Sequence, residues 1–193
     1  MSLVMGFITP YCVVMSGDYR RTRIDNESEH HDDAPKLFHV NEKVLIGVTG
    51  DYNFSRAFLY YLNSQKLDKA TANAVARISR KWLREHSSED TQQRVIIGGI
   101  ADNSKPILII LSSDDYYKYD KRTVKPGRMA WALTYANVDA EPYINEELER
   151  AEEVNTQILA ELARKVNERV ANEDSFVSAK CYVAYIDIHA GVA

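Results

Sequence analysis

Two neighbouring segments of the chain are apolar at almost every position, and this feature constrains the fold most. They are "RVIIGGIA" at residues 94–101 and "PILIILSS" at residues 106–113, joined by the turn "DNSK". A strand with one face in water alternates apolar and polar residues, whereas a run without alternation is typical of a strand covered on both faces. The two runs therefore predict stacked layers rather than an open sheet with one solvated face.

The remaining pattern extends this prediction along the whole chain. Further strands are expected at residues 3–8, 12–16, 36–40, 43–50, 128–136 and 180–190, with 116–120 as a candidate extension of the sheet. Helices are expected after Asp51, which suits an N-cap, and over about 69–86 and about 144–171. The polar segment 24–35 has no period and is expected to be a loop. This order predicts an α+β fold: a single domain over residues 1–193 with two stacked, mainly antiparallel sheets in a four-layer α–β–β–α sandwich.

Composition narrows the classes of function. The chain has 193 residues, of which 45% are hydrophobic and 27% charged, which suits one domain with a sizeable core. A net charge of −4 argues against a general nucleic-acid binder. No apolar run approaches the roughly 20 residues that cross a bilayer, and no signal-peptide pattern is seen, so a cytoplasmic protein with reduced Cys12 and Cys181 is expected. No phosphate loop, dinucleotide fingerprint or Cys/His metal spacing is present, so neither cofactor nor metal is expected.

Three short elements in the first part of the chain form a characteristic series. They are "VVMSGDYRR" at residues 13–21, "KLF" at 36–38 and "LIGVTGD" at 45–51, which leads into a helix. Their order and approximate spacing resemble the proteasome β-subunit family of N-terminal nucleophile hydrolases. The bacterial ATP-dependent proteasome-like peptidases belong to the same group. The resemblance covers nearly the whole chain and implies the same α–β–β–α sandwich.

The resemblance also implies a catalytic site. In that family the nucleophile is the hydroxyl of the first residue of the mature chain, and the α-amine of that residue is the general base. Counting back along the first hairpin from Asp18 places Ser2 at this position. Asp18 would be the acid that holds Lys36 within salt-bridge reach, and the lysine would favour the deprotonated amine. Gly47 would supply a backbone N–H to the oxyanion, and Asp174 would be a supporting acid.

The function implied by the resemblance is cleavage of amide bonds, with peptides as the expected substrates. The expected form is a homo-oligomer, built as a ring or paired rings, with an ATPase partner as an option. Two alternatives stay open, namely a catalytically silent subunit with an assembly or binding role, and a small-molecule amidase. On the residues alone, Asp18 could be a turn acid and Lys36 a solvated strand end. The run "EHHDD" at residues 29–33 offers metal ligands, although adjacent side chains in a loop rarely form a preformed site.

Overall fold

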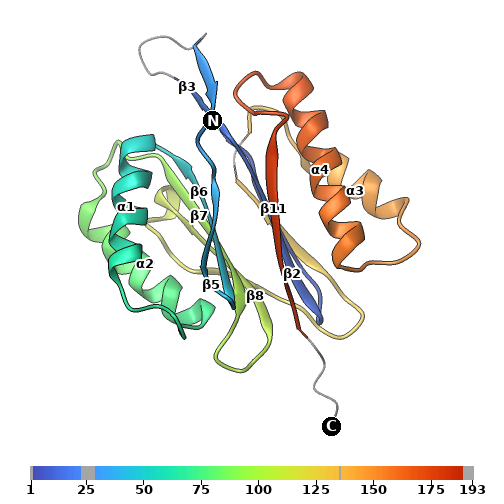
Figure 1. Cartoon of the computed structure of the whole chain (residues 1–193), viewed down its shortest axis with the longest axis horizontal. Helices are drawn as coiled ribbons and strands as arrows, with labels where there is room; N and C mark the ends of the chain where they lie inside the picture. The colour runs from blue at the N-terminus through green and yellow to red at the C-terminus, as the bar shows by residue number, and fades with distance from the viewer. Residues whose placement is uncertain (1, 23–28, 135, 189–193) are drawn as a thin grey trace.

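The computed structural model describes residues 2–22, 29–134 and 136–188. Two antiparallel sheets are stacked face to face, and a pair of helices covers the outer face of each (Figure 1). A short two-stranded ribbon extends from one end of the sandwich, near the N-terminus. The α–β–β–α sandwich predicted from the sequence is therefore confirmed.

The first sheet has four strands and is covered by two helices near the C-terminus. Its strand order is β10-β1-β2-β11. The elements are β1 (Val4–Ile8), β2 (Cys12–Asp18), β10 (Ala130–Leu133), β11 (Cys181–Asp187), α3 (Glu141–Glu149) and α4 (Thr156–Glu173). Side chains alternate along β1, so that Met5 and Phe7 pack with α4 residues such as Leu162, whereas Val4 and Ile8 face the other sheet.

The second sheet has five strands in the order β5-β6-β7-β8-β9. The elements on this side are β5 (Leu37–Asn41), β6 (Val44–Gly50), β7 (Gln93–Ile100), β8 (Pro106–Ser112), the 3-10 turn η1 (Ser113–Asp115), β9 (Asp120–Thr123), α1 (Tyr52–Ser64) and α2 (Ala72–His86). Phe58 of α1 and Leu83 of α2 are fully buried against the outer face of this sheet. As predicted, Asp51 caps α1, and its carboxylate accepts the Phe54 N–H at 2.6 Å.

Glycines allow the two sheets to approach closely. A Cβ at Gly98 would lie 2.5 Å from the sulfur of Met15, and a Cβ at Gly47 would lie 2.4 Å from Cγ1 of Val4. Both distances are far below van der Waals contact, so a side chain at either position would force the layers apart. Gly98 and Gly47 therefore serve close packing of the two sheets.

Three parts of the chain differ from the sequence prediction. The helix expected over 144–171 is divided into α3 and α4, because Asn155 caps a new helix by accepting the Ile158 N–H. Part of the expected loop forms β4 (His30–Asp32), which pairs with β3 (Arg20–Thr22). The sheet continues into β9 only after the turn at Tyr116 and Tyr117.

Some predictions fall partly outside the described residues, namely those on 23–28, 135 and 189–190. Within the described part of the chain, no helix is long and apolar enough to span a membrane. Both cysteines, Cys12 and Cys181, are free thiols.

Candidate functional site

Ser2 lies two residues before β1, is almost fully buried, and contributes to the walls of two cavities. Each cavity has a volume of about 560 Å³. They share Ser2, Thr49, Gly50 and Asp51, so Ser2 lies where they meet. We name them by their walls. The basic cavity is lined by four cationic side chains, those of Arg20, Arg21, Lys36 and Arg56. The acidic cavity is lined by three carboxylates, those of Asp51, Asp90 and Asp114, and by one cation, Arg94, which is paired with Asp114 at 2.8 Å.

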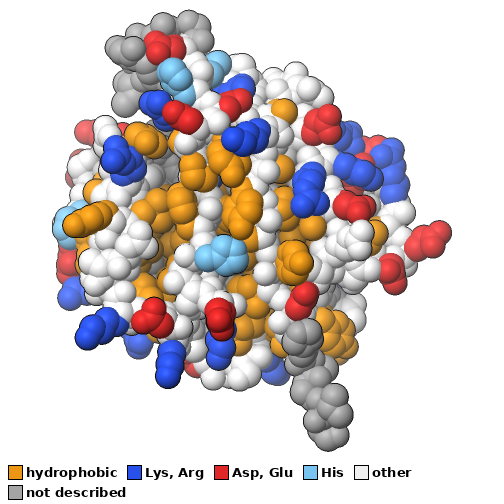
Figure 2. Space-filling model, viewed as in Figure 1, with side chains coloured by type: hydrophobic (Ala, Val, Ile, Leu, Met, Phe, Trp, Pro, Cys, Tyr) orange, Lys and Arg blue, Asp and Glu red, His pale blue; other side chains and the backbone are white. Residues whose placement is uncertain are grey.

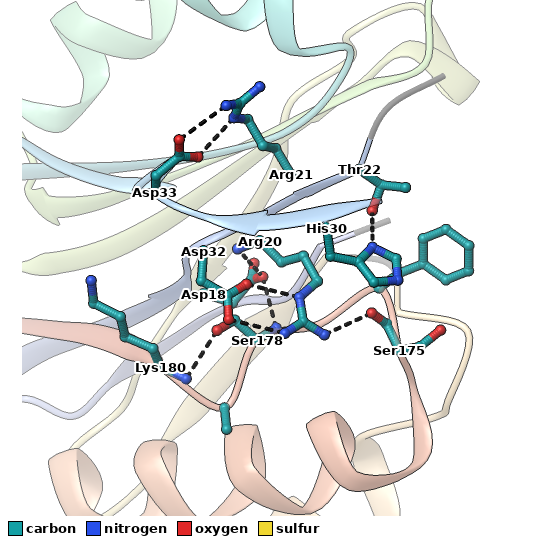
Figure 3. Close-up of polar contacts among 12 residues, drawn as sticks. Asp18, Arg20, Arg21, Thr22, His30, Asp32, Asp33, Ser175, Ser178 and Lys180 are labelled. Atoms are coloured by element: carbon teal, nitrogen blue, oxygen red, sulfur yellow. Dashed lines mark hydrogen bonds and ion pairs between the residues drawn. The ribbon is translucent and has the colours of Figure 1, made fainter. Parts of the chain in front are cut away.

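Asp18 is the last residue of β2 and has no exposed surface. Its carboxylate accepts the backbone N–H groups of Leu3 at 3.2 Å, Arg20 at 2.9 Å and Ser178 at 3.2 Å. Figure 3 shows it between β3 and the loop before β11. Burial raises the pKa of Asp18 to about 6, although the charge of Lys36 and these N–H donors act in the opposite direction. Asp18 thus fixes the backbone next to Ser2.

Lys36 precedes β5 and lies in the wall of the basic cavity together with Ser2. Its carbonyl accepts the Val48 N–H at 2.8 Å, which fixes the backbone at the cavity wall. Burial lowers the pKa of Lys36, and the charge of Asp18 opposes this shift. In the described part of the chain, the ion pairs at this end of the fold do not join Lys36 with Asp18, so the direct salt bridge expected from the sequence is absent. The two charges interact over a longer distance.

Thr134 joins the site without having been predicted from the sequence. It is fully buried just after β10, and its hydroxyl accepts the Val4 N–H at 2.8 Å and donates to the Ser2 carbonyl at 3.2 Å. The sequence shows only a strand-like run at this point. The antiparallel pairing of β1 with β10 is what brings Thr134 beside Ser2.

Asp174 does not contact Ser2. It is the buried C-cap of α4, and its carboxylate accepts the Asn137 backbone N–H at 2.7 Å, the Asn137 side-chain amide at 3.2 Å and the Phe176 N–H at 2.9 Å. It therefore holds the segment that follows Thr134. Its connection to Ser2 is indirect, through that segment.

Gly47 lies in the middle of β6, opposite Leu37 on one side and Ile96 on the other. Its Cα faces Val4 between the sheets, and it lines neither cavity beside Ser2. Thr49 and Gly50, at the end of the same strand, line both cavities, and Gly50 has a φ of +125°. The structure thus brings the end of β6, rather than Gly47, to Ser2.

The β3–β4 ribbon is held by charge pairs across its two strands (Figure 3). Arg20 binds Asp32 through two contacts of 2.8 and 2.9 Å, and it also donates to the Ser175 carbonyl at 2.8 Å. Arg21 binds Asp33 in the same bidentate manner. The aspartates of the "EHHDD" run are thus used within the ribbon. Among the described residues, no group of three or more His, Cys, Asp or Glu side chains is placed to hold a metal ion.

The remaining side chains of that run also have partners. His30 hydrogen-bonds Thr22 at 3.0 Å, and its ring packs edge-on to Phe176. His31 contacts Glu29 at 3.0 Å. The ribbon is therefore a charge-paired extension of the site, fastened to the loop that also contains Asp174 and Ser178.

The four layers place Ser2, two residues before β1, near the buried Asp18 and the partly buried Lys36, and the fold is a sandwich of the proteasome-like type. A solved structure with this arrangement is the crystal structure of eukaryotic HslV from Trypanosoma brucei. It matches 96% of this chain and 99% of that chain, with a TM-score of 0.67 and 15% sequence identity. No protein-family model and no curated protein matches the sequence. At this identity the likeness is one of fold, and it confirms the fold that the sequence resemblance implied.

Proposed function

We propose that the chain is an N-terminal nucleophile hydrolase that cleaves amide bonds in peptides, with residues 1–193 forming one catalytic domain. The observation that carries the proposal is the position of Ser2, buried in the walls of two cavities, one of which is also lined by Lys36. In the active form Ser2 would be the first residue. Its hydroxyl would be the nucleophile and its α-amine the general base.

The reaction follows from these groups. The Ser2 Oγ attacks the substrate carbonyl carbon while its proton passes to the α-amine, whose ordinary pKa of about 7.7–8.0 suits a base near neutral pH. The charge of Lys36 favours the neutral amine. The amide C–N bond breaks, its nitrogen leaves with a proton, and water hydrolyses the Ser2 ester. We assign the oxyanion donor to the end of β6 at Thr49 and Gly50, with Gly47 as the alternative.

Three further residues position the nucleophile. Asp18 accepts the Leu3 N–H, Thr134 donates to the Ser2 carbonyl, and Asp174 holds the segment after Thr134. None of the three needs to touch the substrate. They limit the freedom of Ser2, which matters because a nucleophile must be held close to its attack geometry.

The proposal extends to assembly. We propose that the protein acts as a homo-oligomer, as a ring or paired rings, in the cytoplasm, and that an ATPase partner is compatible with this arrangement. The sequence resemblance and the proteasome-like fold support this extension.

The decisive experiment compares a chain that begins at Met1 with one that begins at Ser2. The second should hydrolyse fluorogenic peptide amides and be labelled at Ser2 by a hydroxyl-reactive inhibitor, whereas the first should do neither. Ser2→Ala in the trimmed chain is the matched control and should abolish both signals. Equal turnover by both forms would exclude the N-terminal mechanism.

A catalytically silent subunit is the second candidate. The absence of a direct ion pair between Lys36 and Asp18 favours it, because a lysine without a close partner is less firmly held. This candidate is adopted if neither form is labelled or hydrolyses any amide. Hydrolysis of small acyl amides but not of peptides would instead identify a small-molecule amidase.

A further inference from the structure

We propose that the basic cavity selects substrates with an acidic side chain, Asp or Glu, at the residue whose carbonyl Ser2 attacks, and that Arg56 is the residue that reads this side chain. The inference rests on the proposed hydrolase function and names its substrate class. It depends on how the charges of the cavity wall are distributed and on which of them are already paired.

Both carboxylates in the wall are already in use. Asp33 is bound by Arg21 through contacts of 2.7 and 3.0 Å. Asp51 caps α1 through the Phe54 N–H. Asp33 is therefore neutralised by its partner, and the charge of Asp51 is offset in part by the helix N-terminus that it caps. Of the four cationic side chains of the same wall, Arg20 is paired with Asp32 and Arg21 with Asp33. Lys36 and Arg56 remain against Asp51, so the electrostatic potential inside the cavity favours an anion.

Of the three arginines in this wall, Arg20 and Arg21 are each paired with an aspartate, whereas Arg56 is not. It is exposed on α1, one turn after Tyr52, and among the described residues it forms no ion pair and no hydrogen bond. Its guanidinium lies 5.6 Å from the centre of the Tyr52 ring, as does that of Arg21. The ring thus places two guanidinium groups at the cavity and leaves the donors of Arg56 for a ligand. A planar fork of donors matches a carboxylate in bidentate geometry.

The rest of the wall suits the aliphatic stem of Asp or Glu. Phe38, Val48 and Leu59 line the same cavity and provide apolar contacts for methylene groups. Because Ser2 is in this wall, the side chain that enters the cavity belongs to a residue close to the attacked carbonyl. The acidic cavity, which also contains Ser2, has Asp51, Asp90 and the Arg94–Asp114 ion pair in its wall, so the acidic preference is confined to the basic cavity.

The test uses the chain that begins at Ser2 and peptides that differ only in the residue before the cleaved amide, namely Glu, Gln, Leu or Lys. We expect kcat/KM for Glu to exceed that for the isosteric Gln by about tenfold or more, since a site built to bind a polar group discriminates strongly against its absence. Arg56→Gln should bring this ratio close to one. Arg56→Glu should make Lys better than Glu.

Arg122→Gln is the matched control, because Arg122 is an exposed arginine of β9 whose partner is Asp120 and which lines neither cavity beside Ser2. Its Glu-to-Gln ratio should equal that of the unmodified chain. Preference for Leu or Lys in the unmodified chain, or an unchanged ratio in Arg56→Glu, would overturn the inference and leave the hydrolase proposal intact.

A binding measurement separates this inference from the function on which it rests. If no peptide is cleaved, the hydrolase proposal fails, and product-type peptides that end in Glu or Gln are titrated calorimetrically into Ser2→Ala. Tighter binding of the Glu peptide that is lost in Arg56→Gln would keep the assignment of an acidic-peptide site. Equal binding of the two peptides would overturn it.

Discussion

Among single residues, Asp18 has the clearest consequence for stability. Its carboxyl is fully buried, and burial raises its pKa from the ordinary 3.8 to about 6. The folded protein therefore holds this proton more tightly than the unfolded chain does. Between about pH 4 and pH 6 the unfolded state is the first to lose the proton, so ionisation of Asp18 lowers the free energy of unfolding as the pH rises through this window.

Replacement of Asp18 by Asn should remove this pH dependence. A shift from 3.8 to about 6 corresponds to roughly 2–3 kcal/mol. Between pH 4 and pH 7 the unfolding free energy of the unmodified chain should fall by about that much more than that of Asp18→Asn. A constant difference in stability between the two chains does not affect this comparison. Denaturant unfolding at several pH values measures the difference. The control is Asp120→Asn, at an exposed position, whose unfolding free energy should change with pH as that of the unmodified chain does. If the profile of Asp18→Asn is also parallel to that of the unmodified chain, the pKa of Asp18 is not raised.

Thr134 provides a second test at this scale, because its hydroxyl bridges Ser2 and Val4. Thr134→Val keeps the shape but leaves the buried Val4 N–H without this acceptor, which should cost about 1–3 kcal/mol of unfolding free energy. Hydrolysis by the chain that begins at Ser2 should also fall, because the Ser2 carbonyl loses its donor. Thr134→Ser keeps the hydroxyl and should retain most of the stability and most of the hydrolytic activity. If Thr134→Val and Thr134→Ser have the same thermal stability and the same hydrolysis rate, the hydrogen bonds of the Thr134 hydroxyl have no energetic role.

At the scale of whole elements, the sequence predicted those whose determining residues are close together along the chain. The doubly apolar strands β7 and β8 and the capped start of α1 were predicted because their patterns lie within a few neighbouring residues. The β3–β4 ribbon was missed because its stability comes from ion pairs twelve residues apart. Thr134 was missed because its partner Ser2 is 132 residues away. Only the stacking of the layers brings such residues together.

The same stacking makes Gly47 an element-scale test. Gly47→Ala would place a methyl group 2.4 Å from Cγ1 of Val4, and such overpacking typically costs about 1–3 kcal/mol. Adding Val4→Ala removes that atom, so the double variant should be more stable than the sum of the two single effects predicts. Chemical denaturation of the four chains measures this coupling. Strict additivity would show that β1 and β6 do not meet at these residues.

Kinetics of the same variants bear on the oxyanion assignment. If Gly47 contributes only to packing, activity should return together with stability in the double variant. If its N–H binds the oxyanion, loss of activity in Gly47→Ala should persist after stability is restored. The second result would favour the assignment made from the sequence over the end of β6.

For the whole molecule, the arrangement of the two sheets leaves edges on one face. The edge strands β5 and β11 open on the same side of the sandwich (Figure 1), and apolar side chains gather across the middle of that face (Figure 2). Phe38, Val40 and Tyr182 line a cavity of about 560 Å³ there, and Tyr185 of β11 is 54% exposed. Open edges and exposed aromatic side chains favour contact with another protein surface.

We therefore expect self-association through this face. Sedimentation at tens of micromolar should show species several times heavier than the 22.0 kDa chain. Replacing Tyr182 and Tyr185 together by Lys should shift the distribution toward the single chain, because two buried charges would oppose the contact. Tyr11→Lys is the control, since Tyr11 is 65% exposed at the turn between β1 and β2 and lies on neither open edge. If the unmodified chain sediments as a single chain of 22.0 kDa, the proposal of a ring fails. If Tyr11→Lys shifts the distribution as much as the double variant does, the contact lies on another surface.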